Sequence, residues 1–197
     1  MKNSIIILVT VWVSLTVLNC NKVENNPPAT APKLSLHDSV TAKPKLTNTN
    51  QDSTAEKIAH YITTDYLSKA DLETIVMNER KFRYQQIDLN GDGNKEVFVI
   101  FSTPYFCGTG GCAMILLDHQ LQPITKFTVT RPPVFADPET KNDWKILYIK
   151  DREEWKELIF ENGKYPSNPS VLPVNTKKPN EKAIGIFENG ESKDFKF

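Results

Sequence analysis

The chain has no excess of charge of either sign, because its 24 Lys and Arg residues are balanced by 24 Asp and Glu residues. A protein that binds nucleic acid usually carries a basic patch, so we expect no nucleic-acid partner. Histidine is scarce, with three residues, and the sequence contains neither a nucleophile elbow nor a zinc-protease helix. The sequence therefore favours a protein that is not an enzyme, although two carboxylates far apart in the chain could still form a hydrolase site.

Long apolar segments are absent after Leu18, so no later stretch suits a membrane-spanning helix of about 20 residues. Before that point, Lys2 is followed by an apolar run at 5–18, and Cys20 comes two residues after the run. The run is too short for an ordinary spanning helix and predicts an export signal. An uncleaved anchor and a plain secretory signal remain open as alternatives.

The end of this run, VLNC, resembles the signal of a bacterial lipoprotein. The resemblance implies a signal peptide at 1–19, cleavage before Cys20 and a diacylglycerol on the Cys20 sulfur, which would hold the mature chain at a membrane. Asn21 is not the Asp that commonly retains lipoproteins at an inner membrane. By the same resemblance we expect the outer membrane, with the protein facing the periplasm, in a cell that has two membranes.

Cysteine is also scarce, and once Cys20 is assigned to lipid only Cys107 and Cys112 remain. In an exported protein two nearby cysteines favour a disulfide over free thiols. Their spacing matches neither the Cys-x-x-Cys redox motif nor half of a zinc site. We therefore predict a structural bridge, with a catalytic or metal role as the alternative.

Residues 20–52 predict a flexible tether, because they are rich in Pro, Asn, Thr, Ser and Lys and have few apolar side chains to offset the entropy of ordering. The remaining residues, 53–197, are enough for one domain with one core. Ser53 and Glu56 fit a capping box at a helix start, followed by apolar side chains at helical spacing. A second short helix is predicted at 70–78.

After Phe82 the pattern changes to strands. The predicted strands are 83–89, 96–103, 113–118, 124–130 and 145–150. Two of them contain continuous apolar runs, at 97–101 and 114–117, which is typical of strands covered on both faces. The sequence therefore predicts an α+β fold, in which an N-terminal helix pair packs on a mainly antiparallel sheet with a disulfide-closed hairpin.

The segment from Asp88 to Glu96 reads DLNGDGNKE, and oxygen-bearing groups recur at every second position: Asp88, Asn90, Asp92, the Asn94 carbonyl and Glu96. Hard cations such as Ca²⁺ prefer oxygen ligands at this spacing. The segment lacks the twelfth-position Glu of an EF-hand, and it resembles the calcium loops between strands of integrin-type propeller repeats. We predict a structural Ca²⁺ site, with a simple Asn-Gly and Asp-Gly turn as the alternative.

The DLNGDG and CGTGGC motifs, the RPP at Arg131, Trp144 and the YPSNPS segment at 165–170, in that order, resemble an uncharacterised family of exported bacterial proteins. The resemblance implies no assigned activity. We expect a lipid-anchored envelope protein whose calcium-stapled domain binds another envelope protein or a glycan, for example to inhibit or protect against an envelope hydrolase. The alternatives are a carboxylate-dependent hydrolase of envelope polymers and a passive structural lipoprotein.

Overall fold

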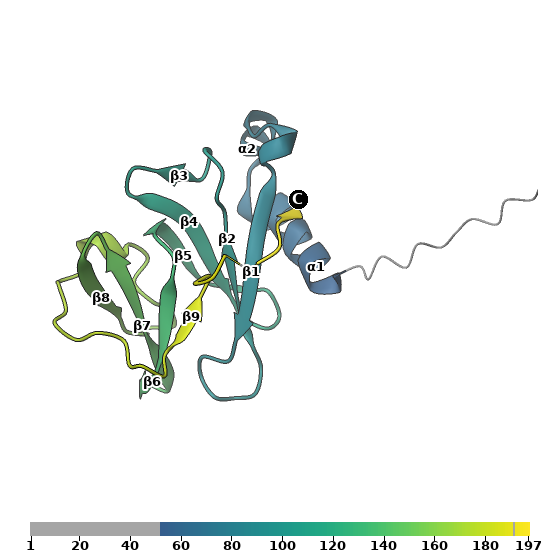
Figure 1. Cartoon of the computed structure of the whole chain (residues 1–197). Helices are drawn as coiled ribbons and strands as arrows, with labels where there is room; N and C mark the ends of the chain where they lie inside the picture. Colours follow the sequence, from purple (N-terminus) through teal and green to yellow (C-terminus); the bar gives the residue numbers. More distant parts are fainter. Residues whose placement is uncertain (1–51, 191) are drawn as a thin grey trace, which may run out of the picture. The chain divides into compact units, whose positions relative to one another are not determined.

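The structure, a computed structural model, describes residues 52–190 and 192–197 (Figure 1). The expected signal peptide at 1–19, the expected lipid-bearing Cys20 and the expected tether as far as residue 51 lie outside these residues. Within them, no helix is both long enough and apolar enough to cross a membrane.

The N-terminal part of the domain is helical. The helix α1 (Ser53–Tyr61) continues as a π-helical segment (Ile62–Tyr66), and then come α2 (Lys69–Thr74) and a 3₁₀ turn (Met77–Glu79). The side chain that caps α1 is Asp52, which accepts hydrogen bonds from the amides of Thr54 and Ala55, and not Ser53 as we predicted. Asp52 therefore belongs to the domain and not to the tether.

The predicted N-terminal helix pair is wrong, because α1 is the only described helix of seven or more residues. The helix α2 has six residues and ends at Thr74, after which Ile75 and Val76 adopt extended backbone angles. Three consecutive β-branched residues disfavour helix here. Leaving the helix also buries Ile75, which is 2% exposed, while Val76 is 56% exposed.

The first sheet is antiparallel and has the order β10-β1-β2-β4, with β3 and β5 both paired to β4. Its strands are β1 (Lys81–Ile87), β2 (Glu96–Ile100), β3 (Cys107–Gly108), β4 (Gly111–Leu117), β5 (Pro123–Thr130) and β10 (Phe195–Lys196). Four of these strands correspond to the strands predicted at 83–89, 96–103, 113–118 and 124–130. The C-terminal strand β10 pairs with β1 at Lys81 and Phe82, and it places the end of the chain beside the helices (Figure 1).

A second antiparallel sheet follows, in the order β8-β7-β6-β9. Its strands are β6 (Val134–Lys141), β7 (Trp144–Asp151), β8 (Glu154–Leu158) and β9 (Ile184–Ile186). Only β7 was among the predicted strands, so this sheet was not predicted as a layer. The connection from β5 to β6 passes through a cis peptide bond between Pro132 and Pro133.

Two hydrophobic clusters, one on each face of the first sheet, hold the layers together. On one face Val97, Val99, Ile115 and Leu117 pack with the buried residues of the helical segment, which include Ile58 and Ile62. On the other face the first sheet packs against the second, through Phe98, Ile100, Met114, Leu116, Leu147, Ile149 and Leu158. Every residue of β2 is buried, which confirms the prediction that this strand is covered on both faces.

Irregular segments lie along the outer edges of both sheets. The Thr128 amide on β5 donates to the Ser167 carbonyl over 3.0 Å, and the Asn175 amide donates to the Trp155 carbonyl on β8 over 2.8 Å. Unpaired strand edges can pair with other chains, and such covering segments prevent this. The YPSNPS segment therefore has a structural role in covering β5, and its Tyr165 is fully buried.

Candidate functional site

The predicted calcium loop connects β1 to β2, the central strand of the first sheet. Gly91 and Gly93 have φ angles of 76° and 87°, in the left-handed region that glycine adopts without strain. An added Cβ at either glycine would meet nothing within 4 Å, so backbone conformation and not space favours glycine here. The loop carries its acidic and amide side chains on a tight, exposed turn.

Three of the predicted ligands share a hydrogen-bond network inside the loop. Asp88 accepts from the Gly91 amide at 2.6 Å and from the Gly93 amide at 3.1 Å. Asp92 accepts from the Asn94 amide at 2.7 Å, and the Asn90 side chain contacts Asp92 through both its oxygen and its nitrogen. The bond from the Asn94 amide is the largest of the effects that hold the Asp92 pKa below its usual range.

Glu96, the fifth predicted ligand, differs from the others because it is 2% exposed. Its Oε2 atom accepts a hydrogen bond of 2.7 Å from the Leu89 amide, across the base of the loop. Burial raises the pKa of Glu96, and the negative charges of Asp92 and Asp88 raise it further, whereas the bond from Leu89 opposes the shift. A buried carboxylate beside two other carboxylates is a place where a cation would relieve repulsion.

The donor set of the loop therefore suits Ca²⁺ in kind, since all five ligands are oxygen atoms. The positions of the side chains suit it less well, because residues 52–190 and 192–197 contain no group of three or more His, Cys, Asp or Glu side chains placed to hold a metal ion. Asp88 and Asp92 are engaged with backbone amides while Glu96 turns toward the interior. The structure thus brings Asp88, Asn90 and Asp92 together, but the three carboxylates do not share one centre.

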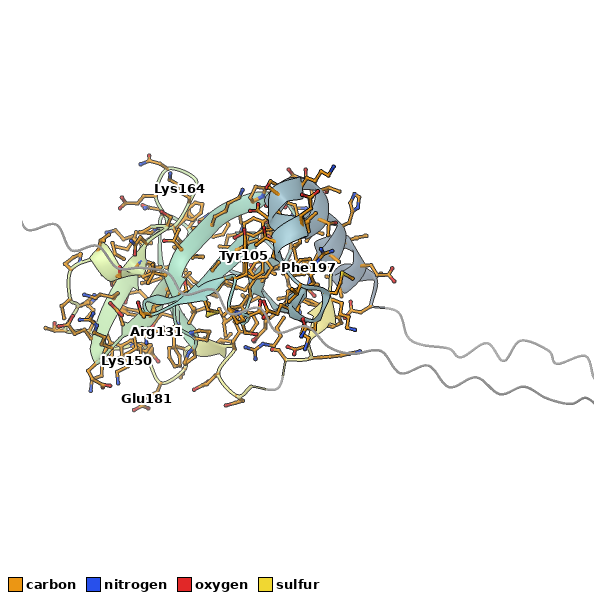
Figure 2. All side chains as sticks on the ribbon, turned by 90° about the horizontal axis from the view of Figure 1, so that it is seen from above. Tyr105, Arg131, Lys150, Lys164, Glu181 and Phe197 are labelled. Atoms are coloured by element: carbon orange, nitrogen blue, oxygen red, sulfur yellow. A yellow bond between two sulfur atoms is a disulfide. The ribbon has the colours of Figure 1, made fainter. Side chains whose placement is uncertain are left out.

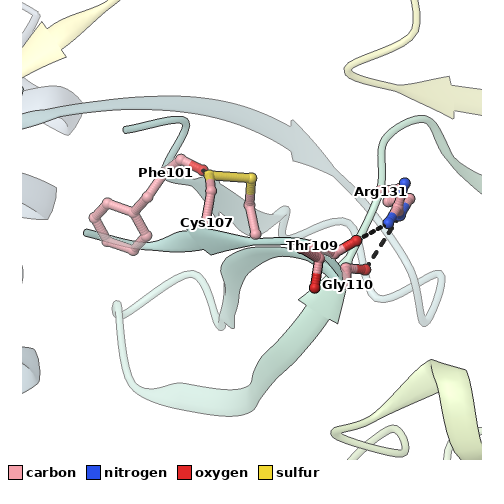
Figure 3. The surroundings of a disulfide bond; sticks show 6 residues. Phe101, Cys107, Thr109, Gly110 and Arg131 are labelled. Atoms are coloured by element: carbon pink, nitrogen blue, oxygen red, sulfur yellow. Dashed lines mark hydrogen bonds between the residues drawn. A yellow bond between two sulfur atoms is a disulfide. The ribbon is translucent and has the colours of Figure 1, made fainter. Parts of the chain in front are cut away.

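The disulfide predicted between Cys107 and Cys112 is confirmed (Figure 3). The two cysteines face each other on β3 and β4, with Cα atoms 4.0 Å apart, and close a short hairpin. Gly111 is required in this hairpin, because a Cβ there would lie 2.7 Å from the Thr130 carbonyl oxygen.

Arg131 fastens this hairpin to the end of β5. Its Nε donates to the Gly110 carbonyl over 3.1 Å, and its Nη2 donates to the Thr109 carbonyl (Figure 3). These two carbonyls are thus occupied by the guanidinium group of Arg131. Together with the disulfide, this contact holds β3, β4 and the end of β5 to one another. Tyr105, in the same connection, donates to Asp71 of α2 and so links the hairpin to the helices (Figure 2).

A groove of about 500 Å³ lies between α1 and the turn that joins β4 to β5. We call it the α1 groove. It is lined by Ser53, Glu56, Lys57, His60, Tyr61, Asp65, Gln120, Leu121 and Gln122. No site was predicted at these residues from the sequence. The two walls are about 60 residues apart in the chain, and no local motif indicates that they meet.

The turn that forms one wall is held by Asp118. The Asp118 carboxylate accepts hydrogen bonds of 2.8 Å from the amides of Gln120 and Gln122, and the Asp118 carbonyl accepts from the Leu121 amide over 3.0 Å. Leu121 has a φ of 64°, which is uncommon for a residue with a branched side chain. The backbone of the turn is thus fixed in one conformation, and Gln120 and Gln122 line the groove.

Two smaller cavities, of about 390 and 270 Å³, adjoin each other beside β8 and share Ile159, Glu161, Pro166 and Leu172 as lining residues. Val171 and Val174, exposed by 75% and 55%, line one each. Segments that cover the edges of β5 and β8 form most of these walls.

No family model matches the chain, and neither a curated protein nor a solved structure matches it.

Proposed function

We propose that the chain is a lipid-anchored protein of the bacterial cell envelope whose folded domain binds another envelope component. The α1 groove carries this proposal, because it has a volume of about 500 Å³ and is lined by polar residues from two separate parts of the chain. The groove begins at Ser53, directly after the segment that we expect to connect the domain to Cys20. The anchor itself is supported by the VLNC sequence.

The scaffold around the groove supports a binding role. The strand β2 is buried on both faces, the hairpin is closed by a disulfide, and the outer edges carry covering segments. A preorganised surface loses less conformational entropy on association than a mobile one, which favours affinity. We propose that this rigid domain inhibits an envelope hydrolase or protects the envelope against one.

We further propose that Ca²⁺ binds at the β1–β2 loop as a local structural staple. The support is the spacing of Asp88, Asn90, Asp92, Asn94 and Glu96, and the burial of Glu96 beside two acidic side chains. For Ca²⁺ to bind, Asp88 and Asp92 must exchange some of their hydrogen bonds to backbone amides for bonds to the ion.

A capture experiment tests the binding function. Full-length, tagged protein is incubated with a detergent extract of the envelope, and retained material is quantified for the wild type and for a double variant, Gln120→Ala with Gln122→Ala. We expect one stoichiometric component that the groove variant retains poorly. Gln86→Ala, at an exposed glutamine on β1, is the matched control and should retain it fully.

The alternatives make different predictions in the same extracts. A carboxylate-dependent hydrolase would degrade cell-wall or glycan polymers, and single acidic substitutions outside 88–96 would abolish that turnover. This result would overturn the binding proposal. The absence of both a retained component and turnover would instead leave a passive structural lipoprotein.

A further inference from the structure

The polar side chains of the α1 groove have no excess of positive charge. Glu56 and Asp65 are carboxylates, Lys57 is a cation, and the amides of Gln120 and Gln122 each donate and accept hydrogen bonds. A site for phosphate or carboxylate groups would instead concentrate arginine, lysine or backbone amides. The lining therefore suits a ligand that is neutral and carries several hydrogen-bonding groups.

Tyr61 supplies a second observation. It forms part of the groove wall, is 8% exposed, and has a buried hydroxyl without a hydrogen-bond partner among the described residues. Burial raises the pKa of Tyr61, with further contributions from Asp65 and Tyr66, so the hydroxyl is a donor at neutral pH. A buried donor without an acceptor destabilises the folded state, and a ligand that brings an acceptor would remove that cost.

Leu121 supplies a third observation. Its left-handed backbone is an uncommon conformation that costs free energy, and it persists because Asp118 holds the amides on both sides of it. The bonds to Asp118 keep the backbone of Gln120 and Gln122 at the groove, so the path of this turn is set before any ligand arrives. Preorganised polar groups of this kind are typical of sites that recognise a particular arrangement of donors and acceptors.

We propose that the α1 groove binds a neutral oligosaccharide. Sugar hydroxyls both donate and accept hydrogen bonds, which matches an edge of carboxylates and amides, and the apolar faces of sugar rings suit Leu121 and the ring of Tyr61. Because the Tyr61 hydroxyl is buried, a hydroxyl or amide oxygen of the sugar would accept from it only after the side chains that cover it move. This inference depends on the proposed binding function and names the ligand class of the same groove.

The test is a calorimetric titration of the full-length protein in detergent with two neutral probes, N-acetylchitotetraose and maltotetraose. We expect at least one of them to bind. Tyr61→Phe should weaken that binding about fivefold to tenfold, the equivalent of one hydrogen bond to a buried donor. The same variant should melt at the same or a higher temperature than the wild type, since an unpartnered donor has been removed. A purely structural role of Tyr61 would not separate affinity from stability in this way.

Gln120→Ala and Gln122→Ala should each weaken sugar binding by about fivefold, while the control Gln86→Ala leaves it unchanged. Inorganic phosphate, titrated in parallel, should not bind. The inference is overturned if neither tetrasaccharide binds up to about 10 mM, if phosphate binds instead, or if Tyr61→Phe and both glutamine variants keep full affinity. Capture of an envelope component that depends on the groove, without binding of either sugar, would overturn this inference but leave the proposed function standing.

Discussion

The Tyr84 hydroxyl, on β1, donates a hydrogen bond of 2.7 Å to the carboxylate of Asp52. The same carboxylate caps α1 by accepting from the amides of Thr54 and Ala55. One side chain therefore both starts the helix and ties that start to the first sheet. This is also the point at which the chain enters the domain, so the wall of the α1 groove is positioned by the Asp52–Tyr84 pair.

Tyr84→Phe should destabilise the domain by about 1 kcal/mol, the typical net value of a partly exposed hydrogen bond. Burial and then the bond to Asp52 raise the pKa of Tyr84 to about 12. Because the pKa of Tyr84 is higher in the folded protein, its contribution to the free energy of unfolding is complete below about pH 10, the pKa of tyrosine in an unfolded chain. The contribution is lost as the pH rises through the pKa of the folded protein. Urea unfolding at a series of pH values should show the wild type and the variant converging between about pH 10 and pH 12.

At acid pH the stability that the Asp52–Tyr84 pair contributes should instead decrease as the pH falls. The bond from Tyr84 is the largest of the effects that lower the Asp52 pKa; burial opposes it, and the bonds from the Ala55 and Thr54 amides lower the pKa further. The contribution of Asp52 to stability is present above the pKa that Asp has in the unfolded chain. It is lost as the pH falls through the lower pKa of Asp52 in the folded protein. Tyr105→Phe, which removes a similar bond to Asp71 at an exposed position, serves as comparison and should cost less. Equal effects of the two variants at all pH values would contradict the linkage.

The disulfide should contribute on the order of 2 kcal/mol to the free energy of unfolding, because it closes a short loop and chain-entropy gains decrease with loop length. Replacing Cys107 and Cys112 together by Ala should remove this contribution and leave the fold intact. Arg131→Ala, which frees the same hairpin from β5 without touching the bridge, is the companion variant. Thiol counting on denatured protein from its native compartment is the direct measurement, and two free thiols there would return the pair to a metal or redox role.

The strands of the first sheet were predictable because their signal is local and strong. Continuous apolar runs in β2 and β4 reflect burial on both faces of the sheet. In the second sheet only β7 has a comparable run, and the other strands lack such a signal. In β8 the inward position opposite Ile149 is occupied by Lys156, whose ammonium group donates to the Leu172 carbonyl over 3.0 Å, so the expected apolar alternation is broken. In β6 the second half is polar and includes Pro138, beside a register shift.

The two candidate sites also differ in whether their sequence signal is local. The oxygen spacing from Asp88 to Glu96 lies within one turn, so the sequence alone revealed it, but it could not show that Glu96 points inward to the Leu89 amide. The α1 groove depends on tertiary packing of α1 against the turn at Gln120–Gln122. His60 and the two glutamines, Gln120 and Gln122, form no sequence motif that would indicate a binding site.

Cys20→Ser should release the protein from membranes or block processing of its signal. The sulfur of Cys20 is the proposed attachment point, and a diacylglycerol places enough CH₂ groups in the bilayer for stable anchoring. Membrane flotation of wild-type and variant cells measures the effect, and mass spectrometry of the mature N-terminus identifies the modification. An unmodified Cys20 in the mature chain would refute the anchor. Cys107→Ser, which leaves the signal intact, is the control and should still float.

Removal of Ca²⁺ should lower the melting temperature, because a ligand that binds only the folded state stabilises it by mass action. Without the bidentate Glu of an EF-hand we expect weak affinity, with a Kd of about 10⁻⁴ to 10⁻³ M. At about 5 mM Ca²⁺ this corresponds to roughly 1–2 kcal/mol, or a rise of a few degrees. Differential scanning calorimetry with Ca²⁺ and with chelator measures the shift, and Mg²⁺ should be less effective because it releases its water reluctantly.

Two substitutions show which side chains bind the ion. Asp92→Ala should abolish the Ca²⁺ dependence and leave the fold largely intact, because the adjoining strand keeps the core contacts of Val97, Phe98 and Val99. Glu96→Gln keeps the shape of the buried side chain and an oxygen for the Leu89 amide, but it removes the charge that burial and two neighbouring carboxylates disfavour. It should therefore stabilise the calcium-free protein and, at the same time, weaken Ca²⁺ binding.

Glu181→Ala, at an exposed carboxylate on the second-sheet side (Figure 2), is the control. If neither heat of binding nor a melting shift appears in millimolar Ca²⁺, the segment from Asp88 to Glu96 acts as a turn, held by its own bonds to backbone amides.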